Sequence, residues 1–391
     1  MYIVHLIRYF YPHIGGNENQ AFRLIQSIKS KSSHDIVVYT YRYSSKLLSE
    51  EDIEGIHVKR LSFLLWFIEF LRWLKVKLEI NLFQRILSRL ILYIEEFDVF
   101  ISFYAEVKKN RAEISLLHIH QLTTIALVAS KLKKKYRIPY IVKDATTDGL
   151  SFFNIIPFGN KAINSIVVNG VFIAMTSVIR NCLLNRGIKA EQIHLIPNGI
   201  TVSDRFIKNS FSNNGQILFI GNYDQGKIKG LDLLIDAFII LRKQGCKFSL
   251  LVAGRGCPDI YMNKLSHNGL GENECQFIGP VKDVEKLYKE SNVYVLPSRA
   301  EGFSNSLIEA LLWGIPCVST DVSSARELIE DKVNGRIAQA EDAESLAECI
   351  KYCINNKVDD WALLSYDRIK KNFSFNIISQ KYIELYNIMC K

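Results

Sequence analysis

One stretch in the second half of the chain decides the fold: residues 297–310, which read Pro-Ser-Arg-Ala-Glu-Gly-Phe-Ser-Asn-Ser-Leu-Ile-Glu-Ala. The apolar residues just before it predict a strand, and the residues after it predict a helix with Ser304 or Asn305 as the N-cap. A strand, a loop and a helix in this order direct free backbone N–H groups and the positive helix end to one point. The stretch therefore predicts an α/β domain with a phosphate-binding loop.

Two carboxylates belong to this loop and helix. Glu301 lies in the loop and Glu309 about one turn into the helix, so both can border the same pocket. Near a bound nucleotide sugar, one carboxylate can accept hydrogen bonds from ribose hydroxyls. The other can bond sugar hydroxyls and stabilise positive charge at the anomeric carbon. From the spacing alone, a helix start with an incidental pair of glutamates is an equally good interpretation.

Short apolar runs alternate with helical patterns along the whole chain, which is typical of parallel α/β architecture. The expected strands are 2–7, 35–40, 55–60, 98–101, 115–119, 139–143, 171–175 and 192–196, then 216–220, 248–253, 276–278, 293–296 and 316–319. The polar stretch 207–215 separates the two series. We therefore expect two α/β domains, 1–205 and 206–372.

Composition fits a two-domain cytosolic protein. The 391 residues exceed the usual size of a single core, and 48% hydrophobic with 23% charged residues excludes wholesale disorder. Eight cysteines form no C-x-x-C pair, and no histidine pair lies near Cys349 and Cys353, so we expect reduced thiols. The first residues lack the features of a signal peptide.

The excess positive charge is confined to the first half. Residues 1–205 hold 27 Lys+Arg and 17 Asp+Glu, a net of +10, and the remaining 22 and 23 give −1. Within that half, residues 61–94 mix aromatic with basic side chains and leave no uncharged window long enough to span a bilayer. This pattern suits helices lying in an anionic membrane interface. An ordinary helix pair packed on the first sheet is the alternative.

The run from Glu301 to Asp321 closely resembles the E-x7-E signature of the retaining glycosyltransferases of family 4, which have the GT-B fold. Further matching motifs follow the same order along the chain: 15–16, 196–200, 229–230, 327–329 and 334–335. The resemblance implies two Rossmann-like domains facing a cleft. It also implies that a C-terminal helix, expected at 373–391, crosses back to pack on the first domain.

The resemblance also implies roles for individual residues. Glu309 would bind the donor ribose, Glu301 would contact the donor sugar near the reacting carbon, and Lys229 would neutralise the departing diphosphate. The backbone at Phe303, Ser304 and Asn305 would hold sugar and phosphate. Gly15 and Gly16 would let the first-domain backbone approach the donor. The alternatives are that Lys229 is an exposed lysine in a turn and that Gly15 and Gly16 only form a tight turn.

The chain departs from the family pattern at two places. Asn222 stands where an arginine is usual, so Arg255 or Arg299 are candidates to supply the missing charge, and Lys227 is a candidate to share or take the role of Lys229. The loop after 140–143 lacks the usual histidine, which leaves Lys143, Asp144 or Asp148 as possible contacts. His120 is our better candidate, over His118, for a polar contact in the cleft. A buried structural histidine is the competing interpretation.

We expect an enzyme that moves a hexose or N-acetylhexosamine from a nucleotide-diphosphate sugar, UDP-linked by preference, to a lipid-linked or polysaccharide acceptor. Its place would be the inner face of the plasma membrane, in contact with anionic lipid. No D-x-D sequence occurs, so we expect neither a metal nor another cofactor. A nucleotide-sugar epimerase of the same fold and a non-catalytic partner subunit are the alternatives. No motif indicates nucleic-acid binding or a dinucleotide dehydrogenase.

Overall fold

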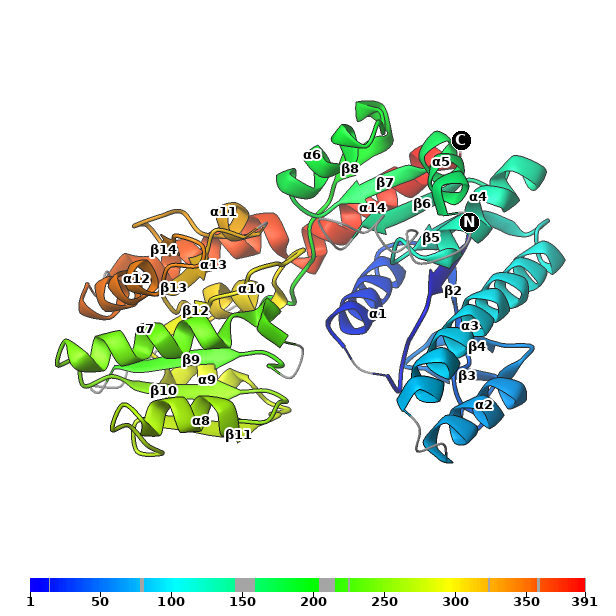
Figure 1. Cartoon of the computed structure of the whole chain (residues 1–391). Helices are drawn as coiled ribbons and strands as arrows, with labels where there is room; N and C mark the ends of the chain where they lie inside the picture. The colour runs from blue at the N-terminus through cyan, green and yellow to red at the C-terminus, as the bar shows by residue number, and fades with distance from the viewer. Residues whose placement is uncertain are drawn as a thin grey trace. The chain divides into compact units, whose positions relative to one another are not determined.

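The computed structural model describes residues 1–13, 15–77, 81–144, 159–203, 215–223, 226–322, 324–356 and 359–390. The chain divides into two compact units (Figure 1). Unit 1 is Met1–Gly199 with Ile378–Lys391, and unit 2 is Ile200–Ile377. These divisions fall six and five residues from the domain limits expected at 206 and 373. The expected linker, 207–215, lies almost wholly outside the described residues.

Unit 1 is built on an eight-stranded sheet in the order β3-β4-β2-β1-β5-β6-β7-β8. Its neighbouring strands are parallel, except that β3 and β4 form an antiparallel pair at one edge. The elements are β1 Tyr2–Ile7, α1 Gly16–Lys29, β2 Asp35–Tyr41, β3 Glu50–Ile53, β4 Ile56–Leu61, α2 Leu65–Lys77, α3 Asn81–Lys109, β5 Ile114–Ile119, α4 Thr124–Tyr136, β6 Tyr140–Asp144, α5 Gly159–Asn169, β7 Val171–Ala174, α6 Ser177–Asn185, η2 Ala190–Gln192 and β8 Ile193–Leu195.

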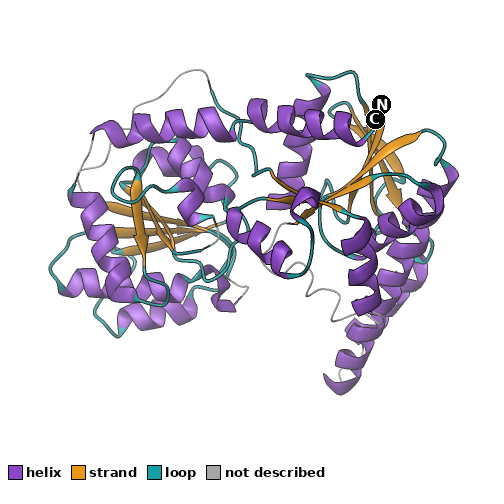
Figure 2. Ribbon diagram, turned by 90° about the horizontal axis from the view of Figure 1, so that it is seen from above, coloured by secondary structure: helices purple, strands orange, loops and turns teal. Residues whose placement is uncertain are grey.

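Unit 2 is built on a six-stranded sheet in the order β11-β10-β9-β12-β13-β14, with every neighbouring pair parallel. Helices flank the sheet of each unit (Figure 2). The elements are β9 Gln216–Ile220, η3 Gly226–Lys229, α7 Leu231–Lys243, β10 Ser249–Ala253, α8 Asp259–Ser266, β11 Cys275–Gly279, α9 Glu285–Glu290, β12 Val293–Leu296, α10 Asn305–Leu312, β13 Cys317–Thr320, α11 Ala325–Leu328, β14 Gly335–Ala338, α12 Ala343–Asn355 and α13 Asp359–Phe373.

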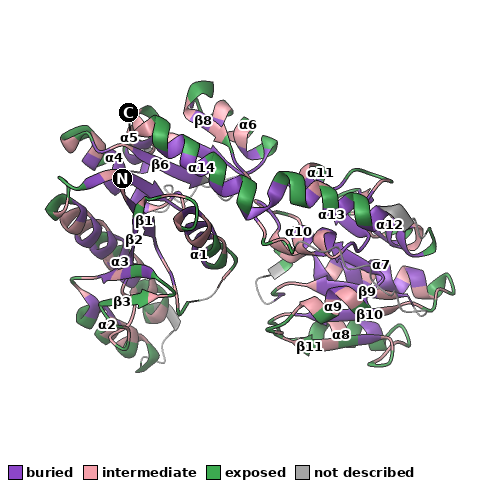
Figure 3. Cartoon of the chain, turned by 180° about the vertical axis from the view of Figure 1, so that it is seen from behind, coloured by how far each residue is buried: buried purple, intermediate pink, exposed green. Residues whose placement is uncertain are grey.

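The cores lie where the strands are buried on both faces. In β12 all four residues are buried, and in β1 all but the first. Figure 3 shows β1 as mostly buried. Parallel strands covered by helices on both sides need apolar side chains on both faces, which is why these strands are continuous apolar runs. The sequence pattern therefore placed most strands within one or two residues of the observed ones.

The expected strand at 98–101 is wrong, because these residues lie inside the 29-residue helix α3. Val99, Phe103 and Val107 are fully buried at a spacing of four, which is the period of one helix face. Asp98 is also buried, and its carboxylate accepts hydrogen bonds from the backbone N–H groups of Phe63 and Leu64. Three apolar residues in a row, Val99 to Ile101, cannot by themselves distinguish a buried strand from a helix segment.

The C-terminal helix α14, Phe375–Met389, belongs to unit 1 from Ile378 onward. Tyr382 and Tyr386 on this helix are fully buried there. The hydroxyl of Tyr386 lies 2.7 Å from Nδ1 of His118 on β5, and Ser379 bonds Ser27 of α1 at 2.9 Å. The chain thus returns to its first Rossmann-like unit, as the resemblance implied.

All eight cysteines are free. Among the described residues, no helix combines the length and the apolar character needed to cross a bilayer.

Candidate functional site

The loop between β12 and α10 has the local geometry that its sequence predicted. Ser304 is the N-cap of α10, and its Oγ accepts a hydrogen bond from the backbone N–H of Leu307 at 3.3 Å. The Ser304 N–H in turn donates to Oγ of Ser324 at 3.2 Å. Phe303, just before the cap, is buried and its ring lies near Phe373. The cap therefore holds the start of the helix, including Asn305, in a fixed position.

Glu301 and Lys229 form an ion pair, with Nζ of Lys229 2.6 Å from Oε1 of Glu301. The same carboxylate oxygen accepts a hydrogen bond from Oγ of Ser298 at 2.8 Å. The Lys229 side chain is 32% exposed and that of Glu301 10% exposed. Lys229 and Glu301 are 72 positions apart in the chain, and the fold brings their opposite charges together at a partly exposed position.

Lys229 reaches this point because its short helix, η3, is fastened to the β12–α10 loop. Gly230, next in the chain, has a φ of +66°, and a Cβ there would lie 1.8 Å from the carbonyl oxygen of Pro297. Only glycine fits such a close backbone approach in a left-handed conformation. The N–H of Arg299 also donates to the carbonyl of Ile228 at 2.8 Å.

Glu309 lies one turn into α10, where the Tyr288 hydroxyl donates to its Oε2 at 3.1 Å. Burial raises the pKa of Glu309, and the hydrogen bond from Tyr288 opposes that rise. Tyr288 comes from α9 and is fully buried. The sequence analysis missed Tyr288, since no motif surrounds it and only the packing of α9 brings it to the carboxylate.

The candidates for the missing positive charge differ in how they are held. The guanidinium of Arg299 bonds both carboxylate oxygens of Asp232, at 2.7 and 3.0 Å, and Glu341 at 2.6 Å. The hydrogen bonds to these carboxylates raise the pKa of Arg299, and the carboxylate charges balance the charge of its guanidinium. Arg255 and Lys227 are exposed instead, Lys227 with Nζ 4.0 Å from Asp232.

Asn222 has a structural partner in the neighbouring loop. Its Oδ1 accepts the backbone N–H of Arg255 at 3.1 Å, and Tyr223 donates its own N–H to the carbonyl of Arg255 at 2.8 Å. Gly254 lies so close to Gly221 that a Cβ would meet the Gly221 carbonyl oxygen at 2.0 Å. The loops after β9 and β10 are therefore tied together, with the Arg255 side chain in solvent.

Gly15 and Gly16 lie in unit 1, where Gly15 is the N-cap of α1 and Gly16 its first residue. The backbone of Gly15 is extended, with a φ of −143°, which any residue can adopt. A Cβ there would lie 2.4 Å from a carboxylate oxygen of Glu18. A larger residue at position 15 would therefore meet the Glu18 side chain, and the backbone conformation would not oppose it.

His120 is buried in a cluster of three imidazoles. Its Nε2 lies 2.8 Å from Nδ1 of His5, and its ring stacks on that of His118. Burial lowers the pKa of His118 and His120 well below the usual value and that of His5 to about 3. These contacts favour the structural interpretation of His120. One nitrogen from each ring lies within 4.8 Å of the others, a spacing that could admit a metal ion.

Lys143 lies beside this cluster and is buried, with its Nζ donating to Oδ1 of Asn198 at 2.6 Å. Burial lowers the pKa of this lysine to about 8. It contributes to the low pKa of both His118 and His120. The side chain of Asp144 and the whole of Asp148 lie outside the described residues.

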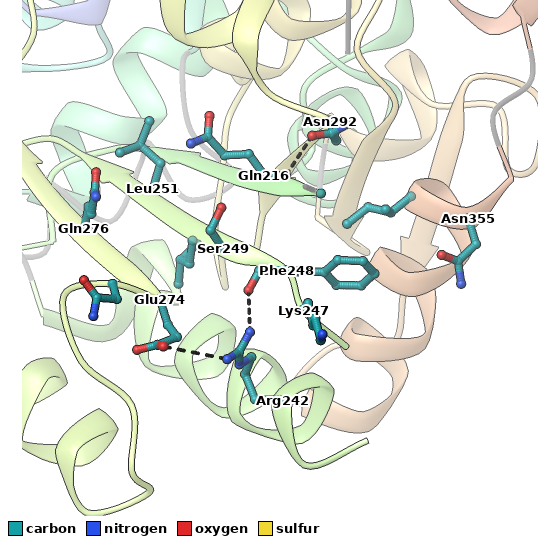
Figure 4. Close-up of a pocket in the computed structure, with 14 residues that line it drawn as sticks. Gln216, Arg242, Lys247, Phe248, Ser249, Leu251, Glu274, Gln276, Asn292 and Asn355 are labelled. Atoms are coloured by element: carbon teal, nitrogen blue, oxygen red, sulfur yellow. Dashed lines mark hydrogen bonds and ion pairs between the residues drawn. The ribbon is translucent and has the colours of Figure 1, made fainter. Parts of the chain in front are cut away.

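A cavity of about 860 Å³ lies elsewhere in unit 2, at the beginning of β9 and β10 (Figure 4). Arg242 crosses its wall, bonded to the carbonyl of Phe248 at 3.3 Å and ion-paired with Glu274. No predicted site residue lines this cavity. Ligands of parallel α/β sheets bind outside the carboxyl ends of the strands, where Glu301 and Lys229 lie, so we do not assign the donor to this cavity.

Parts of the chain match known proteins. Residues 214–356 match the family of glycosyl transferases group 1. The second unit is similar to group 1 glycosyltransferases. An uncharacterised glycosyltransferase of Haemophilus influenzae is 29% identical over 161 residues, 41% of this chain and 44% of the relative. The amylovoran biosynthesis glycosyltransferase AmsK of Erwinia amylovora is 26% identical over 219 residues, 53% of each chain. The chain thus spans about half the length of these relatives.

The fold of the whole chain is shown by solved structures. Anabaena Alr3699/HepE, solved in complex with UDP, superposes with a TM-score of 0.72 at 18% identity, covering 99% of this chain and 100% of the other. Two parallel α/β sheets with this match establish the GT-B fold.

Proposed function

We propose that the chain is a retaining glycosyltransferase that moves a hexose or N-acetylhexosamine from a UDP-sugar to a lipid-linked or polysaccharide acceptor. The observation that carries this proposal is the Lys229–Glu301 ion pair beside the capped start of α10. The group 1 match supports sugar transfer, and the similarity to AmsK, an amylovoran biosynthesis enzyme, supports a polysaccharide pathway. The UDP complex of HepE supports the choice of nucleotide.

In this proposal the diphosphate lies at the start of α10. Backbone N–H groups of Phe303, Ser304 and Asn305 would contact sugar and phosphate, because the positive end of a helix favours anions. Lys229 would leave Glu301 for the phosphate as the leaving group gains charge. A preorganised cation at the site of developing charge stabilises the transition state. Lys227 and Arg255 are exposed and would add to this attraction.

Glu301 would then contact the sugar. Freed from Lys229 and still bonded to Ser298, its carboxylate would accept hydrogen bonds from sugar hydroxyls and stabilise positive charge at the anomeric carbon. The bond from that carbon to the phosphate oxygen breaks, and UDP leaves with the electron pair. The acceptor hydroxyl forms its bond from the same face and gives its proton to the phosphate. No metal takes part in this scheme.

Glu309 would bind the ribose of the donor. Its hydrogen bond from Tyr288 holds one carboxylate oxygen, and burial strengthens any bond that the other makes to a hydroxyl. The first unit would bind the acceptor and meet the donor through Gly15 and Gly16. We also propose that the enzyme works at the cytoplasmic face of the plasma membrane.

The test is calorimetric titration of the purified chain with UDP-, GDP- and ADP-sugars, in the wild type and in Lys229→Ala. UDP-sugars should bind, and Lys229→Ala should weaken binding by about tenfold, the value of one charge-assisted contact. Lys286→Ala, which changes an exposed lysine of α9, is the matched control and should bind normally. Equal affinity of wild type and Lys229→Ala would contradict the assignment. Conversion of a UDP-sugar with no acceptor present would identify an epimerase instead.

A further inference from the structure

The helix pair α2–α3 of unit 1 exposes apolar side chains in two stripes. The stripe on α2 is Trp66, Phe67, Phe70 and Trp73, and that on α3 is Phe83, Ile86, Leu90, Tyr93 and Phe97. Between 43% and 77% of each side chain is exposed. Every exposed large aromatic side chain among the described residues lies between residues 63 and 97. We call these nine residues, with the basic residues between them, the α2–α3 face.

The fold does not account for these side chains. Helix α2 already buries Leu65, Ile68 and Leu71, which is the face that packs on the unit. The α3 stripe repeats every three or four residues, so it follows one side of that helix. Single exposed apolar residues are ordinary on protein surfaces, whereas gathered ones mark a binding surface.

Charge is segregated across the same helices. The acidic side chains point into unit 1. Glu95 pairs with Arg72 at 2.7 Å, Glu96 pairs with Arg8 at 2.5 Å, and Glu69 accepts the backbone N–H of Ser45.

The basic side chains are arranged differently. Lys77, Arg85 and Arg89 are exposed and Lys75 is half-buried, and none of the four has a carboxylate partner among the described residues. Nζ of Lys77 lies 5.4 Å from the centre of the Trp73 ring. The face is therefore apolar and positive, without free negative charge in its described part.

From this arrangement we infer that the α2–α3 face docks on an anionic lipid bilayer, with both helices in the headgroup region. Aromatic rings favour this depth because one part of the ring can be buried while another meets water. Lysine and arginine can bury their stems and keep their charges at the phosphates. The inference goes beyond sugar transfer, and it rests on the proposed function only for the lipid-linked acceptor.

A second copy of the chain is a poorer occupant. Two such faces brought together would oppose lysines and arginines without carboxylates to pair them, which disfavours association. A bilayer with acidic headgroups supplies both the apolar layer and the negative charge.

Flotation of the full chain with lipid vesicles tests the inference. One set of vesicles is phosphatidylcholine, and the other contains about a third phosphatidylglycerol, which supplies the surface charge that attracts basic segments. The protein should float with the anionic vesicles, and float at least tenfold less with the neutral ones or in high salt, which screens the attraction. A wild type that stays unbound to anionic vesicles would overturn the inference.

Two variants locate the surface. Trp66→Ser with Phe70→Ser and Trp73→Ser should reduce flotation at least tenfold, and Arg85→Glu with Arg89→Glu should do the same. The control replaces exposed apolar residues elsewhere, Ile260→Ser with Leu363→Ser and Ile388→Ser, and should float like the wild type. If both variants of the α2–α3 face float as much as the wild type, the inference is wrong.

Two further measurements separate other outcomes. Light scattering that shows a dimer, dissociated by the aromatic variant, would replace the lipid by a second copy and overturn the inference. UDP titration of each variant shows that it is folded and keeps the two proposals apart. Intact UDP binding without flotation contradicts only the membrane surface, whereas flotation without UDP binding contradicts only the proposed function.

Discussion

Two polar clusters of this chain differ in the state of their charges. The Lys229–Glu301 pair in unit 2 is charged and partly exposed, whereas the His5, His118 and His120 cluster in unit 1 is buried and neutral. Each gathers residues from distant parts of the chain. A partly exposed charged pair can exchange its partner for a ligand at modest cost. A buried neutral cluster stabilises the fold as long as it stays unprotonated.

The largest expected effect comes from a substitution in the Lys229–Glu301 pair. Glu301→Gln should lower the transfer rate by about 10² to 10³, the usual cost of losing one preorganised electrostatic contact at a reacting centre. Donor affinity should change little, because the lost interaction is strongest in the transition state. Steady-state kinetics with a UDP-sugar and a lipid-linked acceptor would measure it. A rate within threefold of the wild type would remove Glu301 from the chemistry.

Gly230→Ala tests the backbone contact that positions Lys229. The added Cβ would meet the Pro297 carbonyl oxygen at 1.8 Å in a left-handed backbone, so the loop must shift. We expect a loss of about 2 to 4 kcal/mol in the free energy of unfolding, from strain and broken packing. Urea unfolding measures the loss, and Gly269→Ala, also at positive φ but with open space around it, is the control for conformation alone. Equal losses in both variants would show that the Pro297 contact is unimportant.

Acid should destabilise the folded chain through the histidine cluster. The pKa of His5 is lowered from 6.5 to about 3, so between these pH values the unfolded chain binds a proton that the folded chain does not. The stability is therefore complete above pH 6.5 and falls as the pH decreases. At pH 4.5 the loss is on the order of 3 kcal/mol for this one group. Thermal unfolding of the wild type and of His5→Asn between pH 7 and 4.5 checks it, and parallel curves for the two would contradict the prediction.

The smallest effect concerns the contact of α14 with this cluster. Tyr386→Phe removes the hydroxyl that lies 2.7 Å from Nδ1 of His118. We expect a loss of about 1 to 3 kcal/mol in the free energy of unfolding, since a buried imidazole nitrogen loses its partner. Affinity for UDP should stay unchanged, because the proposed ribose and diphosphate contacts, Glu309, Lys229 and the start of α10, all lie in unit 2. A variant as stable as the wild type, or one with weakened UDP binding, would contradict the contrast between the clusters.

The sequence by itself determined the local features of this protein. Most strand positions, the N-cap at Ser304 and the aromatic and basic content of residues 61–94 follow from patterns that act over a few residues. The strands β3 and β14 were not expected from the sequence. The strand expected at 98–101 failed because helix and strand share short apolar runs, and only contacts at a spacing of four decide between them.

The tertiary structure decided what depends on distant segments. It paired Glu301 with Lys229 and brought Tyr288 to Glu309. It bound Arg299 to Asp232 and Glu341. It also buried His120 beside His5. Folding brings such residues together through packing of whole helices and strands, which leaves no local periodic signal. Exposure of the α2 and α3 stripes was likewise decided by which helix faces the core of unit 1 could cover. The sequence therefore supplied the candidate residues, and packing decided the partners and the solvent exposure of each.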